Sequence, residues 1–127
     1  MIVVGLVLAG LAAVLHVYIF WLESVAWTTT ARSVFGTTEQ EAAATREMAF
    51  NQGFYNLFLA VVSAVGIVVH AAGSPDVGVA LVLAGTGSML AAALVLLLSS
   101  SDKRGAAVRQ GTLPLLAVVA LGVGLLL

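Results

Sequence analysis

Four long apolar stretches, separated by three polar connections of which the first is the longest, make up this 127-residue chain. The apolar stretches cover about residues 2–24, 48–71, 77–98 and 106–127. Each has about the 20 residues that an α-helix needs to cross about 30 Å of hydrocarbon. The pattern predicts an all-α integral membrane protein, a single domain of four transmembrane helices packed as an antiparallel bundle.

The polar connections indicate where the helices begin and end. They cover about residues 23–48, 72–76 and 99–105. In the first, Thr38 and Glu41 have the spacing of a capping box, so the second helix is expected to begin near Thr38 and to carry an amphipathic part outside the hydrocarbon. The second contains Gly73, Ser74 and Pro75 and predicts a tight turn between antiparallel neighbours.

The basic residues predict how the bundle is oriented. All five lie in or beside the first and third connections: Arg32, Arg46, Lys103, Arg104 and Arg109. Since cytoplasmic loops carry the excess of Lys and Arg, both termini are expected outside the cytoplasm, in a multi-pass protein of the inner (plasma) membrane. The first span has no basic region before it and is expected to be retained rather than cleaved as a signal peptide.

The amino-acid composition excludes several classes of function. Hydrophobic residues make up 61% of the chain and charged residues 9%, which excludes a soluble domain. A net charge of -1 without a basic patch excludes a nucleic-acid partner. Cysteine is absent and no metal-ligand spacing occurs, so we expect neither a metal nor another cofactor.

Small residues are frequent in the third and fourth spans, where glycine occurs at positions 78, 85, 87, 122 and 124. Small side chains let helices approach closely in lipid, where no hydrophobic force drives them together. These positions predict a packing face inside the bundle or, alternatively, a homo-oligomer contact through the same surface.

Two ionisable residues lie in the first span, where such groups are costly unless they face the protein interior. His16 and Glu23 are seven residues apart, so on a regular helix they share a face and lie about 10 Å apart along its axis. Phe20 and Trp27 are expected to extend this face. The alternative is an interfacial carboxylate at Glu23 and a neutral imidazole at His16 that is hydrogen-bonded to the backbone.

The second span opens on a dense set of polar side chains. Gln52 and Asn56 share a helix face, and Asn51 and Tyr55 form a parallel row beside it. Such amides can join neighbouring helices by hydrogen bonds. Antiparallel packing should also bring Gln110 of the fourth span to the same leaflet, so that these residues, His16 and Glu23 line one pocket.

Two runs in the chain resemble those of a known family. The runs are His16 to Glu23 (HVYIFWLE) and Asn51 to Ala60 (NQGFYNLFLA), supported by Phe35-Gly36 and by the region of Gln110-Gly111 and Pro114. They are similar to the small bacterial membrane proteins of the DUF1304 family, whose function is unknown. The resemblance implies four spans and a motif-bearing pair of helices, and it assigns no residue a role.

The polar set favours an enzyme acting on a lipophilic, isoprenoid-like molecule from the membrane, of isomerase or cyclase type and without a cofactor. Glu23 would be the general acid, oriented by His16 or Asn56. Ring faces would stabilise developing positive charge, and amides would bind the substrate. The expected binding residues are Phe20, Trp27, Asn51, Gln52, Tyr55 and Gln110. The alternatives are a proton-coupled transporter or channel subunit, and a structural membrane partner.

Overall fold

The computed structural model describes residues 1–127, and it is built from helices throughout. In chain order these are α1 (Ile2–Phe20), the π-helix η1 (Trp21–Val25), α2 (Thr30–Phe35), α3 (Glu39–Ala71), α4 (Pro75–Ser99), the 3-10 turn η2 (Ser101–Lys103) and α5 (Arg104–Leu126). Four helical segments are long and apolar enough to cross a membrane: Ile2–Val25, Glu39–Ala71, Pro75–Ser99 and Ser101–Leu126. The predicted four-helix membrane bundle is confirmed.

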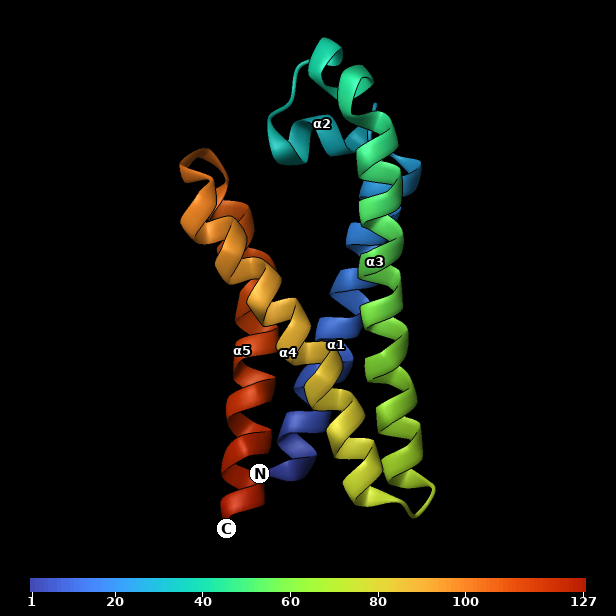
Figure 1. The fold of residues 1–127 in the computed structure, drawn as a ribbon, viewed down its shortest axis with the longest axis vertical. Helices are drawn as coiled ribbons and strands as arrows, with labels where there is room; N and C mark the ends of the chain where they lie inside the picture. Colours follow the sequence, from blue (N-terminus) through green and yellow to red (C-terminus); the bar gives the residue numbers. More distant parts are fainter.

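The four long helices form a ring. α1 packs against α3 and α5, and α4 packs against the same two helices from the opposite side. Both termini and the turn between α3 and α4 lie at one end of the bundle, and α2 and the turn between α4 and α5 lie at the other (Figure 1). We call these the termini end and the loop end.

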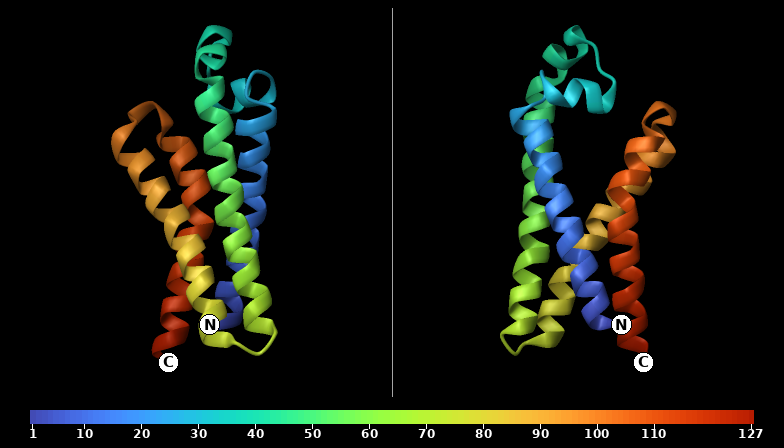
Figure 2. Two further views of the ribbon diagram at one scale, coloured as in Figure 1. Left: turned by 45° about the vertical axis from the view of Figure 1, so that its right-hand side comes forward. Right: turned by 180° about the vertical axis from the view of Figure 1, so that it is seen from behind.

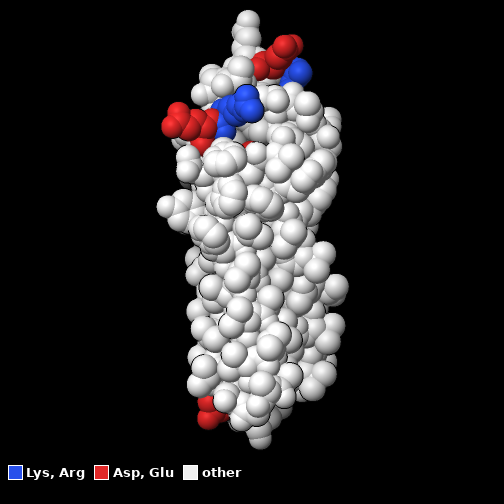
Figure 3. Space-filling view, turned by 90° about the vertical axis from the view of Figure 1, so that its right-hand side faces the viewer, with Lys and Arg blue, Asp and Glu red and all other residues white.

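Charged side chains gather at the loop end. The five basic residues all lie on segments of this end, and Figure 3 shows Lys, Arg, Asp and Glu atoms together there, with only acidic atoms at the termini end. α3 has 33 residues and is about 50 Å long, so its first turns extend beyond a hydrocarbon layer of about 30 Å. The predicted capping box is present: Thr38 accepts a bond from the Glu41 backbone N–H, and the Glu41 carboxylate accepts one from the Thr38 N–H.

Apolar side chains fill the half of the bundle near the termini end. One fully buried cluster joins Ala9, Val82, Ala117 and Leu121. The next layer, toward the loop end, is formed by Ala12, Ala13, Ala60 and Met89. Beyond that layer the pair α4 and α5 diverges from α1 and α3 (Figures 1 and 2).

Glycine sets the distance between α3 and α4. A Cβ atom on Gly66 would lie 2.7 Å from both the Gly78 carbonyl oxygen and the Val82 nitrogen, and Gly85 packs against Ser63 in the same way. Gly78 and Gly85 therefore serve contacts within the chain, whereas a Cβ on Gly87 would meet nothing within 4 Å. A homo-oligomer through the glycine-rich faces stays a prediction.

The segment after the first span differs from the sequence-based prediction. A regular helix was expected to keep Trp27 on the face of His16 and Glu23, but the helix widens into η1 and ends at Val25. The sequence analysis also did not predict α2, a short helix that ends at Gly36 with φ of 69°. At the loop end, α2 runs crosswise from the side of α1 and α3 toward the diverging pair α4 and α5 (Figures 1 and 2).

The packing at Gly66 gives a testable prediction. Gly66→Ala places a methyl group against backbone atoms of α4 that cannot rotate away, so it should lower the free energy of unfolding by about 1–3 kcal/mol. Gly87→Ala, in open space, should leave it unchanged or raise it. Thermal unfolding in detergent measures both, and equal stability of the two variants would contradict the proposed close contact.

Candidate functional site

A carboxyl group and an amide meet between the first and second spans. The Asn56 side-chain N–H donates a hydrogen bond to the Glu23 carboxyl oxygen at 2.7 Å, and a longer one to the carbonyl of Gln52, one turn earlier, at 3.3 Å. Both side chains are half-buried. Glu23 and Asn56 are therefore brought together as expected, and Asn56 rather than His16 orients the carboxyl group.

The π-helix η1 positions Glu23. The wider turn changes the direction of each side chain that follows it, and such turns are often found at functional sites. Two contacts hold η1 on α3: the Ser24 hydroxyl donates to the Phe50 carbonyl at 2.8 Å, and Gly53 leaves room for Ser24. A Cβ atom on Gly53 would collide with the Ser24 hydroxyl and lie 3.1 Å from the Glu23 Cβ.

Asn56 faces the interior of the bundle. It lies seven residues before Ser63, so the two share a face of α3, and Ser63 is fully buried against Gly85 of α4. Toward the loop end from Ser63, α4 diverges from α3 (Figure 2). The Glu23–Asn56 pair therefore joins the first span to α3 on the loop-end side of the buried Ser63.

His16 lies deeper than this pair and is not bonded to it. Its side chain is 2% exposed, and its Nδ1 lies 2.9 Å from the Ala12 carbonyl oxygen, which can only accept, so Nδ1 carries the hydrogen. This is the backbone-bonded imidazole that the sequence analysis gave as the alternative to a catalytic role. No hydrogen bond connects His16 with Glu23.

The other polar side chains at the start of the second span are not gathered around Glu23. Asn51 and Gln52 are exposed, and the Asn51 amide donates to the Glu47 carbonyl of its own helix at 3.0 Å. Tyr55 is 67% exposed. Of the carboxamides in this run, only Asn56 makes a bond to another helix.

The two aromatic residues predicted to extend the face of Glu23, Phe20 and Trp27, lie in different places. Phe20 packs edge-on against Phe54 at 5.1 Å and so joins α1 to α3 at the level of the Glu23–Asn56 pair. Trp27 lies apart from that pair: its indole N–H donates to the Thr45 hydroxyl at 3.1 Å, and its ring packs against Phe35 at 5.6 Å. Trp27 thus fastens the segment beyond η1 and does not extend the face of Glu23.

Gln110 lies on the inward side of α5. It is seven residues before Ala117, which is fully buried, and four before Pro114, which is also buried within a helix that continues through it. No hydrogen bond connects the Gln110 side chain with Glu23 or Asn56, because the start of α5 belongs to the pair of helices that diverges at this end (Figure 1).

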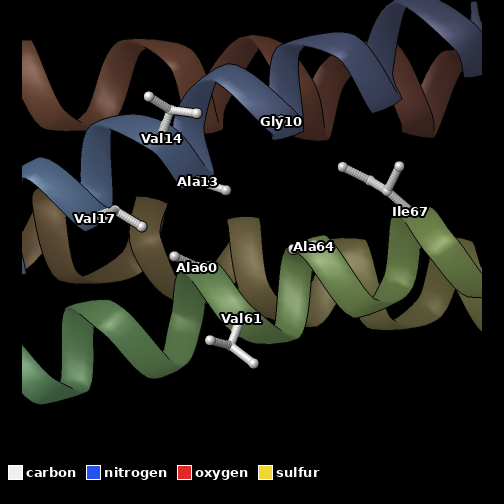
Figure 4. Close-up of a pocket in the computed structure, with 8 residues that line it drawn as sticks. All are labelled: Gly10, Ala13, Val14, Val17, Ala60, Val61, Ala64 and Ile67. Carbon is white, nitrogen blue, oxygen red and sulfur yellow. The ribbon is translucent and has the colours of Figure 1, made fainter.

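An apolar groove follows the joint between α1 and α3. It has a volume of about 350 Å³ and is lined by Gly10, Ala13, Val14, Val17, Ala60, Val61, Ala64 and Ile67 (Figure 4). In Figure 4, Ala13 and Ala60 lie on the facing sides of the two helices, Ile67 projects between them, and Val14 and Val61 point away from the joint. The groove offers no hydrogen-bonding side chain, and no group of three or more His, Asp or Glu residues could hold a metal ion.

Three residues that the sequence analysis did not select fasten η1 and the segment after it to α3. Ser24 and Gly53 join η1 to α3, and Thr45 holds Trp27. Gly53 could have been found, because a glycine within a dense polar run of a helix indicates a close backbone contact. Ser24 and Thr45 carry no comparable signal, since their partners are distant in sequence.

The Glu23–Asn56 bond predicts which amide stabilises the bundle. Asn56→Leu removes the donor to Glu23, and it should lower the free energy of unfolding by about 0.6–2 kcal/mol, the range for hydrogen bonds between membrane helices. Gln52→Leu is the matched control, because its exposed side chain bonds to no other helix. Unfolding in detergent measures the stability of both variants. An equal loss of stability in Asn56→Leu and Gln52→Leu would contradict the assignment of the stabilising bond to Asn56.

Comparison with known proteins identifies the family of this chain but assigns it no activity. No curated protein and no solved structure matches the chain. One family model does match, over residues 10–122, and it is described as "Protein of unknown function (DUF1304)". The matched range includes η1, the Glu23–Asn56 pair and the whole of α3 and α4. Since the match covers most of the sequence, the chain belongs to the DUF1304 family.

Proposed function

We propose that this protein is a membrane enzyme that needs no cofactor, in which Glu23 transfers a proton to a lipophilic, isoprenoid-like substrate. The observation that carries the proposal is the hydrogen bond from the Asn56 amide to Glu23 at 2.7 Å. An amide donor orients a carboxyl group without neutralising it as a Lys or Arg partner would. A positioned carboxyl group of this kind can act as a general acid and base.

The reaction that suits this site is a double-bond isomerisation or a cyclisation. The Glu23 carboxylic acid protonates one carbon of a carbon–carbon double bond, which leaves a carbocation and the Glu23 carboxylate. Loss of a proton from a neighbouring carbon, taken up by the carboxylate or by water, forms the new double bond. The substrate and product have the same composition, and no electron acceptor is required.

The surroundings of the site supply what such a substrate needs. The apolar groove is open to the bilayer and includes Ala60, one helical turn from Asn56, so a hydrocarbon chain lying in it would end close to the Glu23–Asn56 pair. The rings of Phe20 and Phe54 lie at the same level, and aromatic faces attract a positive charge.

The packing of the bundle supports an enzyme more than a carrier. A proton or solute path would have to continue from Glu23 toward the termini end, where the two buried apolar clusters fill the space between the helices. The buried hydroxyl groups at that level, on Ser63 and Thr86, are bonded to carbonyls of their own helices. Hydroxyl groups bonded to their own helix in this way do not form a continuous hydrogen-bonded path for a proton or a solute.

Solvent deuterium provides a test that does not depend on knowing the substrate. Membranes containing the protein are incubated in D2O, and their lipids are analysed by mass spectrometry. A Glu23 carboxyl group that exchanges with water should introduce deuterium into one lipid class. Glu23→Gln keeps an oxygen that accepts from Asn56 but cannot donate an acidic proton, so it should reduce the incorporation about a hundredfold to ten-thousandfold.

The matched control is Glu47→Gln, a carboxyl group on an exposed part of α3. Lipids from membranes that contain this variant should incorporate as much deuterium as those with the unmodified protein. Equal labelling with Glu23→Gln, or no lipid whose labelling depends on the protein, would contradict the proposed proton transfer.

We also propose that the loop end faces the cytoplasm and that both termini lie outside it. All five basic residues lie on segments of the loop end, and the turn between α3 and α4 has none. Because the excess of Lys and Arg remains in the cytoplasm, this distribution favours that orientation in an inner membrane.

The absence of cysteine makes the orientation simple to measure. Ser74→Cys, in the turn between α3 and α4, should react with a membrane-impermeant maleimide in intact spheroplasts. Ser101→Cys, in the turn between α4 and α5, should react only after the membrane is opened. The reverse pattern would place the loop end outside the cytoplasm.

A further inference from the structure

The side of α3 that faces away from α1 has no partner within the protein. α3 lies at the edge of the bundle, and α1, η1 and α4 pack against its other sides (Figure 1). On the free side, Met48 is 75% exposed, Tyr55 67% and Phe58 56%. We call this surface the outer face of α3, and it consists of Met48, Asn51, Tyr55, Phe58, Val62 and Val65.

The residues of the outer face recur alternately three and four positions apart, from Met48 to Val65. This seven-residue repeat is the one with which two helices pack side by side, because it keeps a single seam turned toward the partner helix. The repeat extends over about five helical turns. A second helix can therefore follow the outer face along most of the membrane-spanning part of α3.

Asn51 is the one carboxamide of the outer face. It lies 20 residues before Ala71, the last residue of α3, and so about 30 Å along the helix, at the edge of a hydrocarbon layer. One of its amide hydrogens is bonded to the Glu47 carbonyl of its own helix at 3.0 Å. The other hydrogen and the side-chain oxygen remain free. Lipid tails offer such groups no partner, and Asn side chains in membrane helices bond across to neighbouring helices.

A second copy of the chain has the chemistry that the outer face requires. A carboxamide is both a donor and an acceptor, so Asn51 can pair with Asn51 of another copy, whereas two carboxylates or two ammonium groups would repel each other. α3 has no Asp, Glu, Lys or Arg from Met48 to Ala71, and Figure 3, which looks at this side of the molecule, shows uncharged surface there. Because all copies insert in one direction, a two-fold axis along the membrane normal makes the two α3 helices parallel, with equal residues opposite each other.

We propose that two copies of this protein pack through the outer faces of their α3 helices as a parallel, two-fold symmetric dimer. The free amide hydrogen of Asn51 in each copy is donated to the side-chain oxygen of Asn51 in the other, and this pairing fixes the register of the two helices. The contact differs from the glycine-rich faces of α4 and α5. It does not depend on the proposed proton transfer, because Asn56 lies five residues from Asn51 and so about 140° around the helix.

Disulfide cross-linking in native membranes tests the contact, since the chain has no cysteine of its own. Phe58→Cys and Val65→Cys place a thiol in the outer face, and oxidation with copper phenanthroline should link each variant into a dimer. Val14→Cys is the matched control: Val14 is 69% exposed on α1, at a similar distance from the termini end as Phe58, and this variant should stay monomeric.

Three cross-linking results would overturn the dimer. These are the absence of a link in both outer-face variants, equal linking of Val14→Cys and Phe58→Cys, and linking of Gly87→Cys alone. The last result would assign the contact between copies to the glycine-rich face of α4.

The role of Asn51 is tested by energy transfer between copies labelled at the N-terminus with a donor or an acceptor dye, in phosphatidylcholine vesicles. Asn51→Leu removes the pairing and should weaken dimerisation about threefold to thirtyfold, the effect of one hydrogen bond between membrane helices. Asn51→Gln keeps a carboxamide and should restore most of the association. Unchanged association in Asn51→Leu, or the same loss in both variants, would overturn Asn51 as the residue that joins the two copies.

Discussion

The whole arrangement depends on how closely α3 can approach its neighbours. Lipid tails are as apolar as the helix surfaces, so no hydrophobic force holds the helices together and close packing has to do so. Gly66 brings α3 against the backbone of α4, and Gly53 brings it against η1. These two contacts lie at different levels of α3: Gly66 joins it to α4 near the termini end, and Gly53 joins it to η1 nearer the loop end.

The π-helix η1 packs closely on α3 at Gly53, and it carries the carboxyl group of the candidate site. If α1 continued as a regular α-helix, Glu23 would lie directly above His16, seven residues earlier. The wider turn redirects the chain, and the Ser24 hydroxyl then fastens it to the Phe50 carbonyl. Glu23 reaches Asn56 instead, while His16 stays bonded to its own helix.

The two ends of the bundle consequently have different properties. Toward the termini, the helices are joined by fully buried apolar clusters around Val82 and Met89 and have no room for a polar path. Toward the loops, α4 and α5 separate from α1 and α3, and the ionisable and amide groups lie at this end (Figure 2). The two halves of the bundle therefore differ in how the helix pairs pack: they meet in buried apolar clusters near the termini and diverge near the loops.

The sequence by itself determined the membrane-spanning architecture and the capped start of α3, and it was enough to select Glu23 and Asn56 as candidate site residues. These follow from local patterns: the length of the apolar stretches, capping-box spacing, and the cost of polar groups in lipid. Only the tertiary structure decided which polar groups meet. Glu23 is 33 residues from Asn56, and Trp27 is 18 residues from Thr45. Such pairings depend on the widened turn of η1 and on contacts between helices, and no periodicity along the chain encodes them.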